Sequence, residues 1–152
     1  MLSGWPEPGT TEPVPASARW TSVVTEWCRQ ELNALDFSPC GQRFATGGND
    51  GVVILWDAQT GRAEQRMQAD PKNIWSLSFA ADGARLACGC SRSGSRDGSI
   101  CVLDATTRAL LRSWEEEIQM PEVQFSPVNN SIVATVSFDD ITFRDVDKAA
   151  RC

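Results

Sequence analysis

Three segments of this chain repeat one another, and the repeat limits the folds that the chain can adopt. One phenylalanine and one aspartate recur in each segment at intervals of 41 to 47 residues: Phe37, Phe79, Phe125, Asp57, Asp104 and Asp145. A period near 42 residues with about four short strands per unit is typical of a β-propeller blade. The sequence therefore predicts an all-β fold of about three four-stranded antiparallel blades in an incomplete ring. The blades are expected at about residues 30–67, 73–114 and 118–152.

The first segment shows how one blade is expected to form. Residues 32–37 supply apolar side chains for an inner strand, and Ser-Pro-Cys-Gly at 38–41 forms a turn. Asn-Asp-Gly at 49–51 is a strong hairpin signal, and the β-branched run at 52–56 follows it as a buried third strand. Residues 62–67 are polar and suit the outer edge. The third segment is a degenerate version of this pattern, with an incomplete fourth strand.

The region before the first segment has a different composition. Residues 1–18 contain four of the eight prolines among Gly, Ser, Thr and Glu, so we expect a disordered tail. Residues 19–152 then form the partial propeller. Residues 20–27 alternate and are rich in β-branched side chains, which indicates a strand, although a short helix reaching Leu32 is also compatible with them.

Charge and composition exclude several classes of function. The net charge of −6 argues against nucleic acid or an anionic membrane as the main partner. No apolar run approaches 18 residues, and the first twenty residues do not resemble a signal peptide, so we expect an intracellular protein, cytoplasmic or nuclear. The six cysteines are then expected as free thiols, with Cys88 and Cys90 as small strand residues rather than metal ligands.

Catalysis is not favoured by the residues present. The chain has no histidine, so a serine or cysteine nucleophile would lack its usual base. Asp139 and Asp140 are adjacent, and neighbouring residues on a strand point to opposite faces. No cofactor or metal is therefore expected.

The sequence FSPCGQRFATGGNDGVVILWDAQTG, residues 37–61, resembles the WD40-repeat (WD-repeat) family, and the resemblance weakens through the second and third segments. It implies a β-propeller that serves as a platform for protein interactions, usually without catalysis. Members often carry a Gly-His pair whose histidine joins a network with Asp, Ser or Thr, and Trp. Asp50, Thr46 and Trp56 stand in the last three places, but the histidine is absent, so the network is at best partial. The resemblance thus suggests structural roles for a set of repeat positions, among which Asp50 and Asp97 are equally compatible with simple turn formation: Thr46, Asp50, Trp56, Asp57, Asp97 and Asp104.

The length of the repeat region gives three blades, whereas a closed ring takes four to eight. Three explanations stay open: a fragment of a longer propeller, a ring completed by a second copy or another subunit, and an open three-blade array.

The family resemblance implies that partners bind at the blade end that carries the interblade connections. At that end the insertion SRSGSR contributes Arg92 and Arg96, and Trp75 and its counterpart Asn33 are expected near the rim of the channel. We hypothesise that Trp75, Arg92 and Arg96 form a site for an acidic or phosphorylated peptide. Alternatively, Trp75 packs against the next blade and the arginines belong to a solvated loop.

These observations lead to one expected function with two alternatives. The chain is expected to be a non-catalytic scaffold or adaptor in a multiprotein complex, with protein or peptide partners. Other propeller blades from a second chain are a further possible partner. The first alternative is a purely structural propeller segment whose binding surface lies on other blades. The second is part of a propeller enzyme.

Overall fold

The structure, a computed structural model, describes residues 31–136 and 139–148. The expected tail at 1–18 and the expected strand or helix at 20–27 lie outside the described residues. The described residues form eleven strands, whose bounds are β1 Leu32–Phe37, β2 Arg43–Gly48, β3 Val52–Asp57, β4 Ala63–Gln68, β5 Asn73–Phe79, β6 Arg85–Ser91, β7 Gly98–Asp104, β8 Leu110–Glu116, β9 Glu122–Phe125, β10 Ile132–Val136 and β11 Ile141–Asp145. None of these residues forms a helix of the length and apolarity that a membrane crossing requires.

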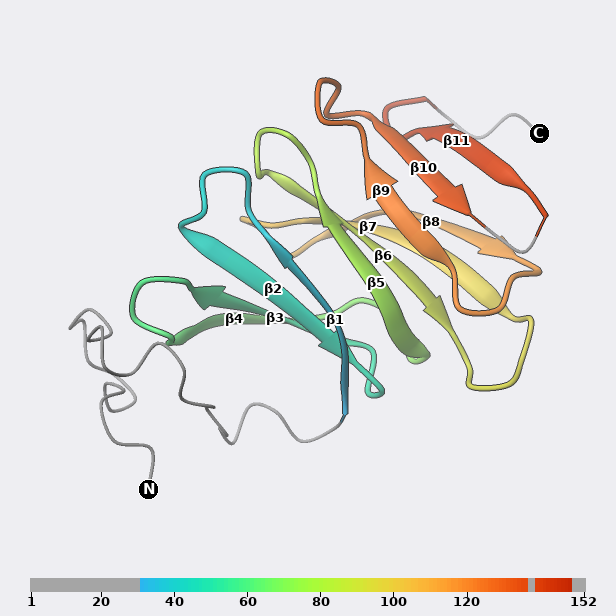
Figure 1. The fold of residues 1–152 in the computed structure, drawn as a ribbon, viewed down its shortest axis with the longest axis horizontal. Helices are drawn as coiled ribbons and strands as arrows, with labels where there is room; N and C mark the ends of the chain where they lie inside the picture. Colours follow the sequence, from blue (N-terminus) through green and yellow to red (C-terminus); the bar gives the residue numbers. More distant parts are fainter. Residues whose placement is uncertain (1–30, 137–138, 149–152) are drawn as a thin grey trace.

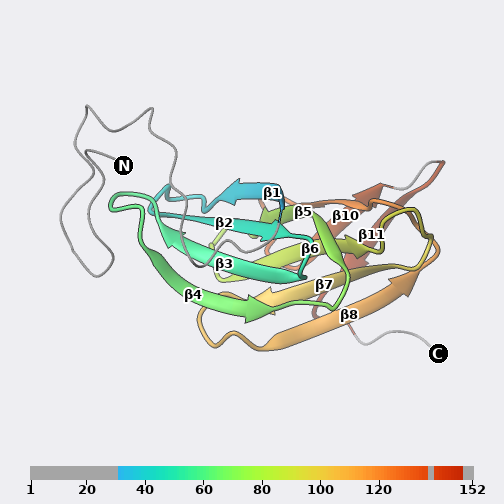
Figure 2. The same ribbon diagram turned by 90° about the horizontal axis from the view of Figure 1, so that it is seen from below.

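The strands form three antiparallel sheets, which we call the first, second and third blades (Figure 1). The first runs β1-β2-β3-β4, the second β5-β6-β7-β8, and the third β9-β10-β11. In the first two blades the chain passes from an inner strand to an outer strand, which Figure 2 shows from β1 to β4 and from β5 to β8. The prediction of an all-β fold built from propeller blades is confirmed, and the blades do not close into a ring.

Apolar side chains fill the space between neighbouring blades. Between the first and second blades, Leu55, Ile74 and Leu86 are fully buried in one core. Between the second and third blades, Ile100 and Phe125 belong to another. Because both faces of β3 and β7 are covered, these strands consist almost entirely of buried residues rather than alternating ones.

Three free cysteines, Cys88, Cys90 and Cys101, lie in the core between the first and second blades. Cys88 and Cys101 are paired across β6 and β7. Burial raises the pKa of the Cys88 thiol well above its ordinary value, so this group is neutral at physiological pH. In the described part of the chain, no group of three or more His, Cys, Asp or Glu residues is arranged to hold a metal.

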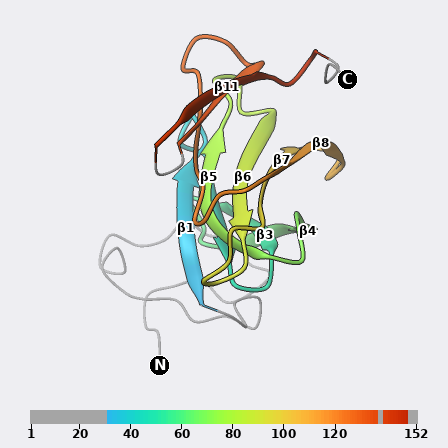
Figure 3. The same cartoon turned by 90° about the vertical axis from the view of Figure 1, so that its right-hand side faces the viewer.

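The inner strands β1 and β5 lie side by side (Figure 3), and backbone N–H groups that donate to side-chain oxygens join each inner strand to the next. The Phe79 N–H donates to Asp36 Oδ2 at 2.7 Å, which ties β5 to β1. The Phe125 N–H donates to Ser78 Oγ at 2.8 Å, which ties β9 to β5 in the same way. Asp36 and Ser78 each stand directly before the repeated phenylalanine of their own blade. Equivalent positions of the repeat therefore supply the acceptor in both connections.

The apolar residues of β1 differ from their expected role. Leu32, Leu35 and Phe37 are 48%, 56% and 55% exposed, whereas their counterparts Ile74, Leu77 and Phe79 on β5 are buried. The reason is the position of each strand among the three blades. β5 lies between β1 and β9, whereas no described blade lies on the other side of β1.

Candidate interaction surface

The two ends of the blades differ in their loops. The linker end consists of the loops at 49–51, 69–72, 92–97 and 117–121, which include both connections between blades. The turn end consists of the tight turns after β1, β3, β5, β7, β9 and β11.

Asn33 and Trp75 occupy equivalent irregularities at the linker ends of β1 and β5. The pairing of β1 with β2 shifts register between Leu32 and Ala34, and that of β5 with β6 shifts between Ile74 and Ser76. A bulge of this kind re-aims the side chain that it contains. The structure therefore gives Asn33 and Trp75 the equivalence that the sequence predicts.

The two side chains make different contacts. Trp75 is half-buried, and its indole Nε1 donates to the Ser91 carbonyl at 3.1 Å. Asn33 Nδ2 donates to Asn49 Oδ1 at 2.7 Å and to the Ile74 carbonyl at 3.2 Å, so it joins the first blade to the second. Trp75 consequently presents a fixed, partly exposed aromatic surface, whereas the amide of Asn33 is engaged in holding the blades.

The two arginines of the inserted loop at 92–97 differ in their contacts. Arg92 forms an ion pair with Asp97 across the loop, and its backbone N–H donates to Asp97 Oδ1 at 3.2 Å. A hydrogen bond from Ser95, followed by the bonds and charge of Arg92, lowers the pKa of Asp97 to about 2. Arg96 is exposed and has no ion-pair partner among the described residues. Arg96 therefore carries the free positive charge of this loop.

The connection between the first and second blades contains two buried charges that the sequence reasoning did not single out as a site. Asp70 Oδ2 accepts a hydrogen bond from Ser99 Oγ at 2.9 Å, and Asp70 Oδ1 accepts one from the Lys72 N–H at 2.9 Å. Lys72 Nζ lies 2.9 Å from Glu115 Oε2. Burial lowers the pKa of Lys72, but the Glu115 hydrogen bond and the nearby carboxylates outweigh it, so the pKa is raised overall. No periodicity marks Asp70 and Lys72, because their burial depends on how two blades meet.

The linker end becomes acidic toward the third blade. Four exposed carboxylates there have no ion-pair partner in the ranges that the structure describes: Glu117, Glu122, Asp139 and Asp140. Arg96 lies in the loop of the second blade, before this acidic region in the chain. The unpaired arginine and these unpaired carboxylates thus lie in different loops of the linker end.

The structure brings Thr46 and Trp56 together, since the Trp56 indole Nε1 donates to Thr46 Oγ1 at 2.9 Å within the sheet. Asp50 is outside this contact. Its Oδ1 accepts the Val52 N–H at 3.1 Å, and its Oδ2 lies 3.9 Å from Arg66 Nη2. Asp50 therefore shapes the hairpin turn, as Asp97 shapes its loop.

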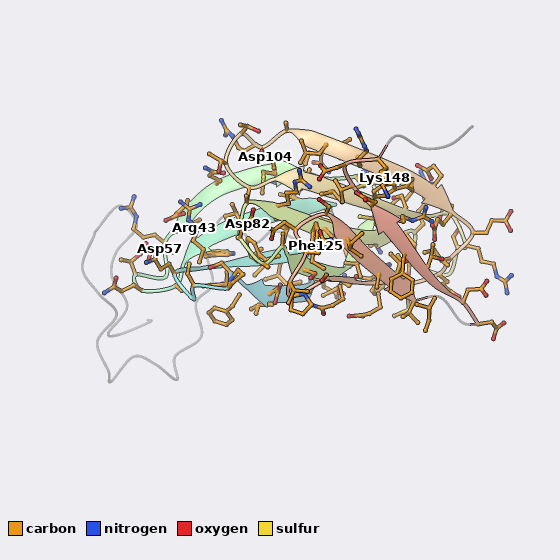
Figure 4. The ribbon with its side chains drawn as sticks, turned by 90° about the horizontal axis from the view of Figure 1, so that it is seen from above. Arg43, Asp57, Asp82, Asp104, Phe125 and Lys148 are labelled. Atoms are coloured by element: carbon orange, nitrogen blue, oxygen red, sulfur yellow. The ribbon has the colours of Figure 1, made fainter. Side chains whose placement is uncertain are left out.

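Asp57 and Asp104 lie at the turn end, where they are labelled in Figure 4. Each accepts two backbone N–H groups at 2.8 Å from the turn that follows it. These hydrogen bonds lower the pKa of both carboxyls. Their place in the structure is a turn, away from Trp75 and Arg96.

Comparison with known proteins places these features in a family. Residues 22–57 and 62–104, more than half of the chain, match the family described as WD domain, G-beta repeat. The chain is 38% identical over 71 residues to the spindle assembly checkpoint protein bub3 of Schizosaccharomyces pombe, which covers 47% of this chain and 22% of that protein. It is 30% identical over 95 residues to the retinoblastoma-binding protein 5 homolog of Drosophila melanogaster, covering 62% of this chain and 18% of that protein.

Solved structures support the fold. The β-propeller domain of Cps50 (Swd1) from Myceliophteria thermophila superposes with a TM-score of 0.68 at 22% identity, covering 78% of this chain and 35% of that one. The chain thus spans well under half the length of these relatives. The match extends to the blades and their arrangement.

Proposed function

This chain belongs to the WD40-repeat family, and from that membership and the geometry of its linker end we propose that it is a non-catalytic platform for protein interactions inside the cell, in the cytoplasm or nucleus. Three features support the proposal: the family of the chain, the named relatives, and a fixed aromatic side chain at the end where the blades are connected. The partner in this proposal is a segment of another protein, within a multiprotein complex.

The observation that carries the proposal is the position of Trp75. Its ring is half-buried and held by a hydrogen bond to Ser91, so a ligand that covers it need not order the side chain. A rigid aromatic group with low entropic cost is a common centre of binding energy at interfaces. We assign Trp75 the role of apolar anchor for a bound peptide.

The charges around Trp75 suggest which peptide binds. Arg96 is the free cation of the adjacent loop, whereas Arg92 is already paired with Asp97. An acidic or phosphorylated side chain of the ligand would pair with Arg96. In this proposal Arg92 positions the loop, and Asn33 fixes the neighbouring blade. The carboxylates toward the third blade would repel a ligand that is acidic along its whole length, so the ligand carries its negative charge at one end.

A selection experiment tests this proposal without a known partner. Random twelve-residue peptides displayed on phage would be selected on the purified chain, and their affinities measured by fluorescence anisotropy. Trp75→Ala should weaken binding of the selected peptides by at least about tenfold, as expected for a central aromatic anchor. Arg96→Ala should weaken only those selected peptides that carry an acidic residue, and synthetic versions of them with phosphoserine at that position.

The matched control is Arg108→Ala, which removes an exposed arginine at the turn end. It should leave the affinities unchanged. If Trp75→Ala leaves the protein folded and the affinities unchanged, the proposal is wrong.

A second role is favoured by a specific observation, the open flanks of the array. Apolar side chains are exposed on β1 and on β11, where Ile141 and Phe143 are 67% and 72% exposed. Flanks of this kind suit a structural segment that completes a larger propeller. The two roles are compatible, because the linker end stays accessible when the flanks are covered.

A further inference from the structure

Met120 is an exposed apolar residue with a strained backbone at the linker end. It lies in the loop that joins β8 to β9, and it is 56% exposed, whereas Ile118 of the same loop is buried. Met120 is the one exposed large apolar side chain in the four loops of the linker end, all of which the structure describes. Its φ angle is 53°, in the left-handed region that residues other than glycine rarely adopt. Strain of this kind clusters at functional sites.

Hydrogen bonds to the second blade hold Met120 in this conformation. The Met120 N–H donates to Ser91 Oγ at 3.1 Å. The carbonyl of the next residue, Pro121, accepts from Ser76 Oγ at 2.7 Å, and the same oxygen accepts from the Val123 N–H at 3.1 Å. Both serines are buried. The backbone of Met120 is therefore fixed while its side chain stays in contact with solvent.

Ser91 connects Met120 to the aromatic residue of the proposed site. Its hydroxyl accepts from the Met120 N–H, and its carbonyl accepts from the Trp75 indole N–H at 3.1 Å. One buried residue thus fixes a half-buried aromatic ring and an exposed thioether side chain. The loop that contains Arg96 begins directly after Ser91. Trp75, Met120 and the loop of Arg96 therefore meet at one point of the linker end.

The charges near Met120 are opposite to the charge of Arg96. Glu117 stands three residues before Met120, and Glu122 stands two residues after it. Both carboxylates are exposed, and neither has an ion-pair partner within residues 31–136 and 139–148. A ligand that covers Trp75 and Met120 meets a positive charge in one loop and negative charges around the other. Complementary charges at an interface fix the orientation of the partner.

We propose that Met120 is the second apolar anchor of the peptide site, and that this site binds a segment with two apolar side chains between an acidic or phosphorylated residue and a basic residue. One apolar side chain packs on Trp75 and the other on Met120. The acidic end pairs with Arg96, and the basic end pairs with Glu117 or Glu122. Because a methionine side chain is flexible, it adapts to apolar groups of different shape. The inference rests on the proposed function and adds the second apolar contact and the direction of the ligand.

Met120→Gly separates binding from folding, because glycine adopts the positive φ angle without strain and lacks the side chain. The variant should not lower the melting temperature. Its affinity for the peptides selected on the unchanged chain should fall by at least about fivefold. Val128→Gly is the matched control, since it removes a 90% exposed apolar side chain from the turn between β9 and β10 and should leave the affinities unchanged. Equal effects of the two substitutions overturn the proposal.

A double-mutant cycle tests the basic end of the ligand. Glu117→Gln and Glu122→Gln together in the protein would be combined with replacement of the basic residue of a selected peptide by glutamine. Each change alone should weaken binding, and the second should have a smaller effect once the first has been made. Independent effects of the two changes, or selected peptides without a basic residue, contradict the assigned orientation.

Oxidation tests the contact with Met120 without any substitution. Hydrogen peroxide transfers one oxygen atom to the sulfur, and the products are methionine sulfoxide and water. A saturating selected peptide should slow this conversion, which mass spectrometry follows at Met120, whereas a scrambled peptide should not. An unchanged rate with the selected peptide contradicts the contact.

Trp75→Ala distinguishes this inference from the proposed function. If Trp75→Ala weakens binding and Met120→Gly does not, Met120 is not an anchor, and the proposed function is unaffected. If neither substitution weakens binding, the proposed site itself is wrong.

Discussion

At the level of single residues, the contact between Trp56 and Thr46 is what the first blade keeps of the network expected from its family. The indole N–H and the threonine hydroxyl are both buried, and they satisfy each other at 2.9 Å. A buried donor without an acceptor costs about 1–3 kcal/mol. The loss of the histidine is therefore tolerated where the remaining pair is still complete.

Thr46→Val tests this contact. The variant keeps the shape of the side chain but removes the acceptor, so the free energy of unfolding should fall by about 1–3 kcal/mol. Urea denaturation followed by tryptophan fluorescence measures the change. Thr106→Val, at an exposed turn position, is the control and should alter stability by less than about 0.5 kcal/mol. Equal effects of the two substitutions would refute a role for the buried hydrogen bond.

Arg108 in the second blade occupies the turn position that Gly61 has in the first blade, and its backbone there has a positive φ angle. Gly61 and Arg108 close equivalent turns with φ angles of 74° and 67°, a region that side chains other than glycine rarely adopt. Arg108→Gly should therefore raise the free energy of unfolding by about 0.5–1 kcal/mol, while Gly61→Ala should lower it by a similar amount. Thermal unfolding of both variants provides the measurement. A lower melting temperature for Arg108→Gly would contradict the expected strain.

The turn carboxylates make stability depend on pH in the acid range. Hydrogen bonds hold the pKa values of Asp57 and Asp104 below the unfolded value of about 3.9. The stability that they contribute is present above that value and is lost as the pH falls through their folded pKa values. Asp57→Asn should flatten the decline of the unfolding free energy between about pH 5 and pH 2. An unchanged slope in urea titrations would show that Asp57 does not contribute.

At the level of elements, two glycines set how closely neighbouring blades approach. A Cβ on Gly47 would clash with the Ile74 side chain, and a Cβ on Gly89 would clash with the Pro121 carbonyl and with Ser76. Gly47 and Gly89 hold equivalent places on β2 and β6. Each blade thus meets the next at a position without a side chain.

Alanine at these two positions should have different consequences. Gly47→Ala should cost about 1–3 kcal/mol of unfolding free energy, and Ile74→Ala in the same chain should relieve part of the clash that it creates. Gly89→Ala should cost at least as much without relief, because its neighbour is backbone. Double-mutant cycles by urea denaturation measure the coupling. Purely additive effects of Gly47→Ala and Ile74→Ala would rule out this contact.

The strands were predictable from the sequence because the repeat places turn residues at fixed intervals. Asn-Asp-Gly at 49–51 and the β-branched run after it lead directly to β2 and β3. The exposure of Phe37 was not predictable, since it depends on whether another blade covers β1. The burial of Asp70 and Lys72 could not be predicted from the sequence either, because it arises where two blades meet. The ion pair of Arg92 with Asp97 was easier to predict, because the two residues are only five positions apart in the loop that joins β6 to β7.

At the level of the whole molecule, the blades give the chain two kinds of surface. The two flanks of the array expose apolar side chains of β1 and β11, and each of these strands is an edge strand of its sheet. Both features suit association with further blades. Among the described residues, the linker end carries a fixed aromatic side chain, one arginine without an ion-pair partner and a separate group of carboxylates. Because the flanks and the linker end are distinct, covering the flanks with further blades leaves the proposed site at the linker end accessible.

The central claim is that a protein partner binds at the linker end, and hydrogen–deuterium exchange with and without a selected peptide tests it most directly. The account predicts slower exchange in residues 73–79 and 92–97 when the peptide is bound, with no change in the turns at 57–62 and 104–109. Slower exchange confined to those turns, or to β11, would contradict it.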